Sequence, residues 1–343
     1  MRNFLRSLGL FFLVAILIAC QPHILQNAPL EQSVTSANCR IVEHEGGRTQ
    51  ICGKPQKVAI LEPKLLSMAL ALGVQPAAYA DYYTVRSPRF DNPSQQIPYL
   101  GQFVTSQPIN LGDRDTPSLE LLTLLKPDLI LDVSWRKNPL LSSIAPTVSI
   151  DIDKAWQSNL KIVAQALDQE KNVEAVLTSH QQALDQVRAQ LSSLVGTHPK
   201  ILNVVASPTM DHISVDYGGN AIRLLEKIGF QPVALPTIDP SSAERFQIDL
   251  ETLAQIDADI ILVNSWRLDN WDGRSAYQVP LRDLQQQWAK QPLLHTSRAW
   301  KEKRVYFVDY YLWIGVTMPP LADSLILEQL PSLLRSPNLS LLD

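Results

Sequence analysis

An internal repeat restricts the folds open to this chain more than any other feature of its sequence. Ser118–Arg136 (SLELLTLLKPDLILDVSWR) and Asp249–Arg267 (DLETLAQIDADIILVNSWR) align at a constant offset of 131 residues, with nine of nineteen positions identical. A second matching pair, Leu72–Pro76 and Ile228–Pro232, stands at an offset of 156. Matching segments at fixed spacing indicate a structural unit used twice. We therefore expect two related lobes, the first with a longer loop within residues 79–115.

Each copy of the repeat has the pattern of a helix followed by a strand. In the first copy, Thr116 offers an N-cap, Pro117 suits the first helical turn, and an apolar strand begins at Asp128. The second copy has its strand at Ile260–Val263. Two further strands and two further helices are expected upstream of the copies: Lys57–Leu61, Lys200–Ala206, Pro63–Leu72 and Gly219–Ile228. Strands that alternate with helices predict an α/β fold of two Rossmann-like lobes with parallel central sheets.

The segment between the two lobes has a helical pattern. Lys154–Val195 contains neither Gly nor Pro, and its apolar residues recur at helical spacing. This predicts one or two helices, the second about 25 residues and roughly 40 Å long. A coiled-coil arm is an alternative, but the position between the repeats favours a single long helix that joins the lobes.

The N-terminus has the pattern of an export signal. Arg2 and Arg6 precede the apolar run Leu8–Ala19, which Cys20 follows. The run is shorter than the ~20 residues that a membrane-spanning helix needs, so we interpret it as a signal peptide. The ending Leu17–Cys20 resembles a bacterial lipobox, in which Cys20 becomes the lipidated first residue. An ordinary signal peptide cut nearby is the alternative; lipidation would anchor the protein at the periplasmic face of the membrane or at the cell surface.

Two cysteines, Cys39 and Cys52, remain after removal of the signal. Export leads to an oxidising compartment, which favours a disulfide between them, while two free thiols are the alternative. The polar residues 21–38 are typical of a flexible tether. The predicted organisation has five parts: signal peptide 1–19, tether and cysteine leader 20–52, first lobe 53–153, linking helices 154–197 and second lobe 198–343.

Several motifs follow one another in an order that is typical of one family. They are Pro55–Leu61, Ala69–Pro76, Leu111–Arg114, Pro127–Ile130 and Ile144–Val148. With the lipobox and the linking helix, they resemble class III substrate-binding proteins of bacterial ABC importers, most closely the iron–siderophore group. The cysteine leader resembles that of cyanobacterial-type members. The resemblance covers about residues 39–335 and implies a non-catalytic protein that captures a ligand in a cleft between its lobes and delivers it to a permease dimer.

The repeat places candidate ligand contacts in both lobes. In parallel α/β sheets, ligands bind beyond the carboxyl ends of the strands. Trp135 and Arg136 follow the strand of the first copy, and Trp266 and Arg267 follow that of the second. A guanidinium suits an anionic chelate because it donates paired hydrogen bonds to carboxylates, and an indole offers a broad apolar face. Core packing for the tryptophans and surface ion pairs for the arginines are the alternatives.

The resemblance implies further ligand contacts. Arg114 stands where the family often has an arginine against the ligand. An aromatic residue often follows the strand predicted at Arg304–Val308, where Tyr311 and Trp313 would share a face if the strand continued. Two loop residues of the first lobe without a motif match, Tyr82 and Arg86, are further candidates, with solvated loop positions as the alternative. The second lobe adds Trp271, which follows its strand.

The repeat also contains a matched pair of glutamates, Glu120 and Glu251, each in the first turn of its predicted helix. A favourable interaction with the helix dipole is one explanation for them. The resemblance implies another, in which each lobe docks through one glutamate onto permease arginines.

These features predict a binding protein for a ferric siderophore, in particular an anionic citrate-hydroxamate or ferric citrate. The iron would arrive already chelated, so we expect no cofactor and no metal site of the protein's own. Cobalamin and haem are alternative ligands. An exported hydrolase is less favoured because the chain has no nucleophile elbow or HExxH motif, and an adhesion-type surface module is a distant alternative. The net charge of −4 argues against nucleic-acid binding, and we expect a monomer.

Overall fold

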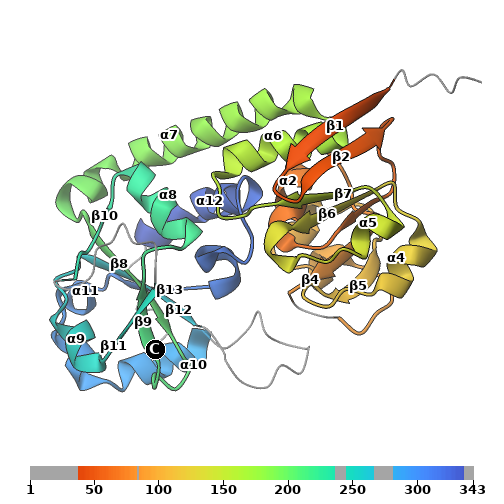
Figure 1. Ribbon diagram of the computed structural model, residues 1–343. Coiled ribbons are helices and arrows are strands. Elements are labelled where there is room, and N and C mark those ends of the chain that lie inside the picture. Colours follow the sequence, from red (N-terminus) through yellow and green to blue (C-terminus); the bar gives the residue numbers. More distant parts are fainter. Residues whose placement is uncertain (1–37, 83–84, 236–244, 266–280, 336–343) are drawn as a thin grey trace, which may run out of the picture. The chain divides into compact units, whose positions relative to one another are not determined.

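The first lobe is built on a sheet of five parallel strands in the order β5-β4-β3-β6-β7. The computed structural model describes residues 38–82, 85–235, 245–265 and 281–335 (Figure 1). The strands are β3 (Val58–Ile60), β4 (Ala78–Asp81), β5 (Ile109–Asp113), β6 (Leu129–Val133) and β7 (Thr147–Ile150). Helices connect them: α2 (Pro63–Ala71), α3 (Pro93–Gln96), α4 (Leu119–Leu125), α5 (Leu141–Ile144) and α6 (Trp156–Leu167).

The central strands of the second sheet are parallel, as predicted, but one antiparallel strand makes the sheet mixed. Its order is β11-β9-β8-β12-β13, with β10 beside β8. β8, β10, β12 and β13 pair in parallel, whereas β9 is antiparallel to both β8 and β11 because it follows β8 through a short connection. The strands are β8 (Lys200–Ala206), β9 (Ile213–Asp216), β10 (Gln231–Pro232), β11 (Arg245–Ile248), β12 (Ile260–Ser265) and β13 (Val305–Val308). The helices are α8 (Asn220–Ile228), α9 (Leu250–Gln255), α10 (Leu281–Ala289), α11 (Arg298–Lys301) and α12 (Leu321–Arg335).

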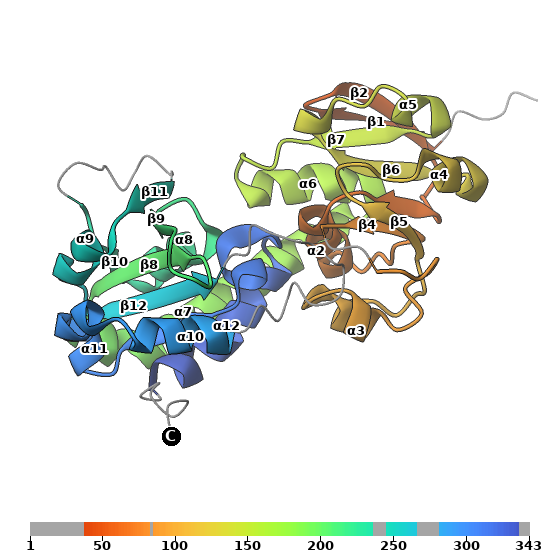
Figure 2. The same cartoon turned by 90° about the horizontal axis from the view of Figure 1, so that it is seen from below.

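The sequence repeat corresponds to one structural unit in each lobe. β6 pairs with β3 in the first sheet. β12 pairs with β8 in the second sheet (Figure 2). The repeated aspartates make the same hydrogen bond in both lobes. Asp128 accepts a hydrogen bond from the backbone N–H of Lys57 at 2.9 Å, and Asp259 accepts one from that of Lys200 at 2.8 Å. Each carboxylate therefore fixes the start of the neighbouring strand.

Side chains that stand one residue before each repeat helix cap it. Ser118 Oγ accepts the N–H of Leu121 at 3.3 Å, and Asp249 accepts the N–H of Thr252 at 2.7 Å. The expectation that Thr116 caps the first helix is wrong, since α4 begins at Leu119 and Ser118 occupies the N-cap. Both caps satisfy backbone donors that the first helical turn leaves unpaired.

A single long helix, α7 (Val173–Thr197), joins the lobes, as the sequence predicts (Figure 1). Its first half packs Val173, Val176 and Leu177 against the core of the first lobe. Its second half contributes buried Leu184 and Leu191 to the core of the second lobe. The helix therefore belongs to both hydrophobic cores. Within the ranges that the structure describes, no helix is long and apolar enough to cross a lipid bilayer.

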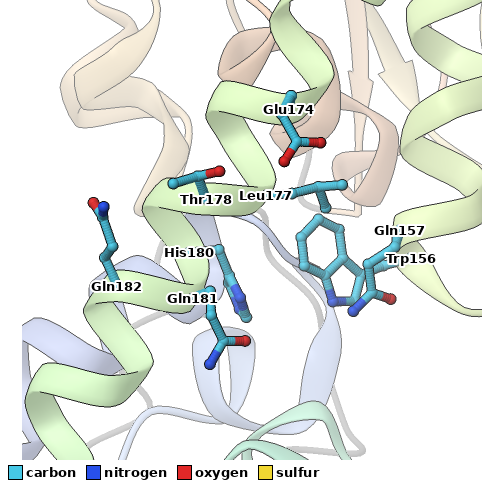
Figure 3. A pocket seen from close by; sticks show the side chains of 8 residues that line it. All are labelled: Trp156, Gln157, Glu174, Leu177, Thr178, His180, Gln181 and Gln182. Atoms are coloured by element: carbon cyan, nitrogen blue, oxygen red, sulfur yellow. The ribbon is translucent and has the colours of Figure 1, made fainter.

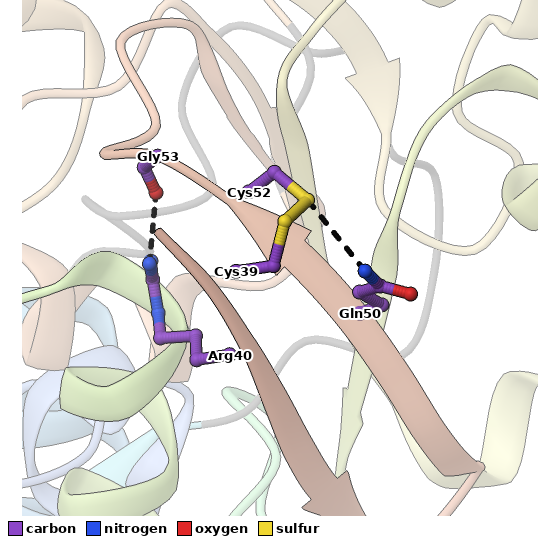
Figure 4. The surroundings of a disulfide bond; sticks show 5 residues. All are labelled: Cys39, Arg40, Gln50, Cys52 and Gly53. Carbon is purple, nitrogen blue, oxygen red and sulfur yellow. Dashed lines mark hydrogen bonds between the residues drawn. A yellow bond between two sulfur atoms is a disulfide. The ribbon is translucent and has the colours of Figure 1, made fainter. Parts of the chain in front are cut away.

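The cysteine leader is an antiparallel hairpin of β1 (Cys39–His44) and β2 (Gly47–Cys52), closed by the Cys39–Cys52 disulfide (Figure 4). The predicted disulfide is therefore present. Arg40 fastens the hairpin by donating to the carbonyl oxygens of Gly53 and Ala166, each at 2.8 Å, at the end of α6. The predicted signal peptide, Cys20 and most of the tether lie outside the described residues.

Candidate functional site

A buried carboxylate organises the carboxyl end of the first sheet. Glu62 stands two residues after β3 and has no exposed surface. Its Oε1 and Oε2 accept hydrogen bonds from Nη1 of Arg114 at 2.8 and 3.0 Å, and Nη2 of Arg136 lies 3.6 Å from Oε2. Burial raises the pKa of Glu62, while the charges of Arg114, Lys64 and Arg136 act in the opposite direction. Because both oxygens face cationic donors, we assign the carboxylate form.

A second acid completes this cluster of four charged side chains, Glu62, Asp132, Arg114 and Arg136. Asp132 lies in β6 and bonds Nη1 of Arg136, one turn along the chain. Arg136 also donates to the carbonyl oxygen of Leu61 at 3.3 Å, and only 6% of its side chain is exposed. Burial raises the pKa of Asp132 to about 6, although the neighbouring guanidinium of Arg136 opposes this shift. We call these four residues the charged cluster.

Two exposed aromatic rings lie over the arginines of the charged cluster. The guanidinium carbon of Arg114 is 4.7 Å from the ring centroid of Tyr82 and 6.0 Å from that of Trp135. Arg136 lies 5.0 Å from the Trp135 ring. These are cation–π distances, and the rings remain 39% and 48% exposed, respectively. The first lobe thus offers aromatic faces backed by cations, at the ends of β3, β4, β5 and β6.

Local chain geometry explains these positions. Parallel strands bring their carboxyl ends to one edge of the sheet. The backbone N–H of Arg114 donates to the carbonyl oxygen of Asp81 at 2.8 Å, which ties the end of β5 to the end of β4. A 3₁₀ turn at Ser134–Arg136 follows β6, and it leaves Trp135 exposed while Arg136 is turned inward. The two predicted ligand residues therefore have different roles: Trp135 offers an exposed aromatic ring, and Arg136 is a buried cation.

The second lobe has a related arrangement that the sequence analysis missed. Arg245, the first residue of β11, has its Nε 3.5 Å from Oδ1 of Asp216, and its guanidinium lies 5.7 Å from the ring of Tyr310. Asp216 also accepts hydrogen bonds from Asn203 and from the N–H of Gly219. Burial raises the pKa of Asp216. No motif singles out Arg245, and it stands at the start of β11, outside the predicted pattern of residues that follow strands.

The expectation that Tyr311 and Trp313 contact ligand is corrected by their burial. β13 ends at Val308, and Tyr311–Gly315 forms a π-helix, so strand alternation does not apply. Tyr311 is 1% exposed and donates to Oδ1 of Asp81 at 2.8 Å. Trp313 is 2% exposed and belongs to the core of the second lobe. Trp313 is therefore a packing residue, and Tyr311 is buried in a hydrogen bond to the end of β4.

The remaining predicted residues divide into three groups. Arg86 is exposed in the loop after β4, and its role stays a prediction. Trp266, Arg267 and Trp271 lie outside the described residues. Glu120 and Glu251 are exposed in the first turns of α4 and α9, as the repeat predicts, while their docking role is untested.

Metal-binding side chains are not gathered in the part of the chain that the structure describes. There, no group of three or more His, Cys, Asp and Glu residues is placed to hold a metal ion. A cavity of about 440 Å³ lies elsewhere, on α6 and α7 (Figure 3). Its lining consists of Trp156, Gln157, Glu174, Leu177, Thr178, His180, Gln181 and Gln182. It includes no residue from the strand ends.

The sequence of this chain is similar to those of known binding proteins. A family model described as periplasmic binding protein matches residues 58–312. The Fe(3+)-citrate-binding protein YfmC of Bacillus subtilis (strain 168) is 27% identical over 311 residues, which cover 88% of this chain and 88% of that protein. The achromobactin-binding periplasmic protein of Dickeya dadantii (strain 3937) is 27% identical over 264 residues, covering 76% and 80%, respectively.

Solved structures have the same fold. Staphylococcus aureus SirA, crystallised with staphyloferrin B, superposes with a TM-score of 0.65 at 24% identity, over 84% of this chain and 97% of that chain. The petrobactin-binding protein YclQ of Bacillus subtilis gives a TM-score of 0.67 at 18% identity, over 87% and 99%. Both support the two-lobed α/β architecture described above.

Proposed function

This chain belongs to the periplasmic binding protein family, and from that premise we propose that it is the solute-binding component of an ABC importer for a ferric siderophore or ferric citrate. The observation that carries the proposal is the pair of exposed rings, Tyr82 and Trp135, held over buried arginines at the carboxyl ends of parallel strands. The names of relatives specify a ferric citrate and an achromobactin as ligands, which supports an iron chelate. Members of the family are binding proteins, so we assign no catalytic step.

Aromatic rings and guanidinium groups of the protein would hold the chelate, and no side chain would coordinate its iron. Its iron is already coordinated when it arrives, so the protein needs only to recognise the organic shell. The Trp135 and Tyr82 rings would pack on that shell, and the partly exposed Arg114 would donate to its carboxylates. In the second lobe, Arg245 and Tyr310 would contact the opposite side of the chelate.

We keep the remaining residues that the sequence predicts as contacts of the proposed anionic ligand. Trp266, Arg267 and Trp271 follow β12, the strand that corresponds to β6 by the repeat, and Arg86 follows β4. Guanidinium groups at these positions would add charge that a citrate-type chelate requires.

Fluorescence titration of the mature chain tests the proposal. Ferric citrate, a ferric citrate-hydroxamate and a neutral ferric hydroxamate are compared with cobalamin and haem. We expect saturable quenching by at least one ferric chelate, and a loss of part of the quench in Trp135→Phe. Trp300→Phe is the matched control, because Trp300 stacks on His295 at a centroid distance of 4.4 Å, in the second lobe. Tight binding of cobalamin or haem without a response to any ferric chelate would refute the proposal.

Delivery to the membrane is the second part of the proposed function. Lipidation at Cys20 would hold the protein at the membrane, and Glu120 and Glu251, exposed on α4 and α9, would each pair with an arginine of the permease dimer. Mass spectrometry of the membrane-extracted protein tests lipidation, which an unmodified Cys20 would exclude. The Glu120→Ala/Glu251→Ala double variant should bind the chelate normally yet fail to support uptake. Normal uptake would exclude the docking role.

A further inference from the structure

We propose that Glu62 determines the charge preference of the ligand site, by neutralising the arginines that stand behind Tyr82 and Trp135. This inference rests on the proposed function, because it concerns which chelates the same site selects. The Glu62 side chain is not exposed to solvent, so it cannot contact the ligand directly. As a specificity-determining residue it would act through Arg114 and Arg136.

Both oxygens of Glu62 are occupied by contacts with the two arginines. Both of its oxygens accept from Nη1 of Arg114, and one of them lies 3.6 Å from Nη2 of Arg136. Arg114 is 17% exposed, whereas the Glu62 side chain is fully buried. A chelate that approaches the aromatic rings therefore meets a guanidinium whose charge is already paired from behind.

The charges of the charged cluster are balanced when all four groups are ionised, because it contains two guanidinium groups and two carboxylates. On its flanks, Lys64 adds a positive charge that acts on Glu62. Asp115, with Oδ1 3.6 Å from Nε of Arg114, and Asp113 add negative charges that act on Tyr82. The first lobe thus offers polarised aromatic faces and N–H donors without a net positive charge.

Removing the charge of Glu62 would alter this balance in a predictable direction. In Glu62→Gln, one guanidinium charge behind the rings is uncompensated, while a neutral amide of similar size fills the buried position. For an anion roughly 10 Å from that charge, Coulomb's law at an effective dielectric constant of about 20 gives an affinity change on the order of tenfold. A neutral chelate would gain nothing from the added charge.

The experiment measures the affinity of the full mature protein for ferric citrate and for a neutral ferric hydroxamate, at low and high salt. The readout is the ratio of the two affinities, which a merely structural change would leave constant. We expect Glu62→Gln to raise this ratio about tenfold in favour of ferric citrate at low salt, with less effect at high salt. Glu328→Gln removes the same charge from an exposed position on α12 and should leave the ratio unchanged.

Asp132→Asn provides an independent variant of the charged cluster, because it removes the carboxylate that pairs with Arg136. It should shift the ratio in the same direction, and it decides the question if circular dichroism shows that Glu62→Gln does not fold. A ratio that stays constant or falls in the folded variants would overturn the inference. Failure of the wild-type protein to bind either chelate would instead refute the proposed function.

Discussion

Both carboxylate oxygens of Glu62 accept hydrogen bonds from a single nitrogen of Arg114, at 2.8 and 3.0 Å, although 52 residues separate the two positions in the chain. The contact joins the end of β3 to the loop after β5, and these strands are not neighbours in the sheet. It therefore spans the edge of the first sheet and fixes the guanidinium beneath Tyr82.

Loss of this contact should cost stability as well as affinity. Arg114→Ala removes the hydrogen-bond donor to both oxygens of the buried Glu62 carboxylate, and breaking a buried ion pair costs about 3 kcal/mol. Urea denaturation should show this decrease in the free energy of unfolding. Arg48→Ala is the matched control, because Arg48 pairs with Glu43 on the exposed hairpin. Equal stabilities for both variants would show that the Glu62 contact contributes little.

Trp135 should behave as a binding residue rather than a packing residue. Because 48% of its surface is exposed, Trp135→Ala should change the free energy of unfolding by less than about 1 kcal/mol. It should weaken binding of the ferric chelate about tenfold, through loss of the aromatic face. Parallel thermal melts and titrations separate the two effects. A large drop in melting temperature with unchanged affinity would identify Trp135 as structural.

A buried polar network should hold the linking helix in place. Nε2 of His180 on α7 lies 2.7 Å from Oδ2 of Asp323 on α12, and Asn220 on α8 donates to Oδ1 of the same carboxylate at 2.5 Å. Asp323→Ala leaves these buried partners unsatisfied and should cost about 2–3 kcal/mol of stability.

The matched control for this network is Asp185→Ala, whose carboxylate pairs with Arg188 on the exposed face of α7 and should contribute less than about 1 kcal/mol. Chemical denaturation of both variants makes the comparison. A smaller loss in Asp323→Ala than in Asp185→Ala would contradict the account of the buried network.

Asp309 should make stability depend on pH. Burial raises its pKa from 3.8 to about 6, although backbone N–H groups of Tyr311 and Leu312 act in the opposite direction. The folded state therefore binds a proton more tightly than the unfolded state, so this group's contribution to stability is greatest below pH 4 and is lost as the pH rises through about 6.

Asp309→Asn lacks this titration. The melting temperature of the variant should therefore rise relative to that of the wild-type protein between pH 4 and pH 7. Thermal unfolding of both proteins across this range measures the difference. A difference that is constant, or that falls as the pH rises, would show that Asp309 does not titrate as its burial indicates.

Local patterns in the sequence predicted part of the elements of each lobe. The repeat located α4, β6, α9 and β12, and the absence of Gly and Pro located the long helix α7. These features depend on neighbouring residues, whose spacing is visible in the chain. The mixed second sheet was missed because the direction of β9 depends on how its connection folds back.

The site was predicted only in part, for a physical reason. The strand end marked Trp135 and Arg136, and the family resemblance marked Arg114; the structure brings these three residues together. Glu62 is buried and pairs with two arginines that are distant in sequence. Both properties arise from tertiary packing, which no local pattern encodes. Tyr311 was misassigned for a similar reason, because the π-helix that buries it has no recognisable signal in the sequence.

Calorimetric titration of the mature protein with ferric citrate-type chelates tests the central claim most directly, with iron-free citrate and uncomplexed ferric ion as controls. The account predicts saturable binding of one ferric chelate per protein molecule, weakened in Trp135→Ala, with little heat from either control. Binding of bare ferric ion as tightly as of its chelates, or no binding of any ferric chelate, would contradict it.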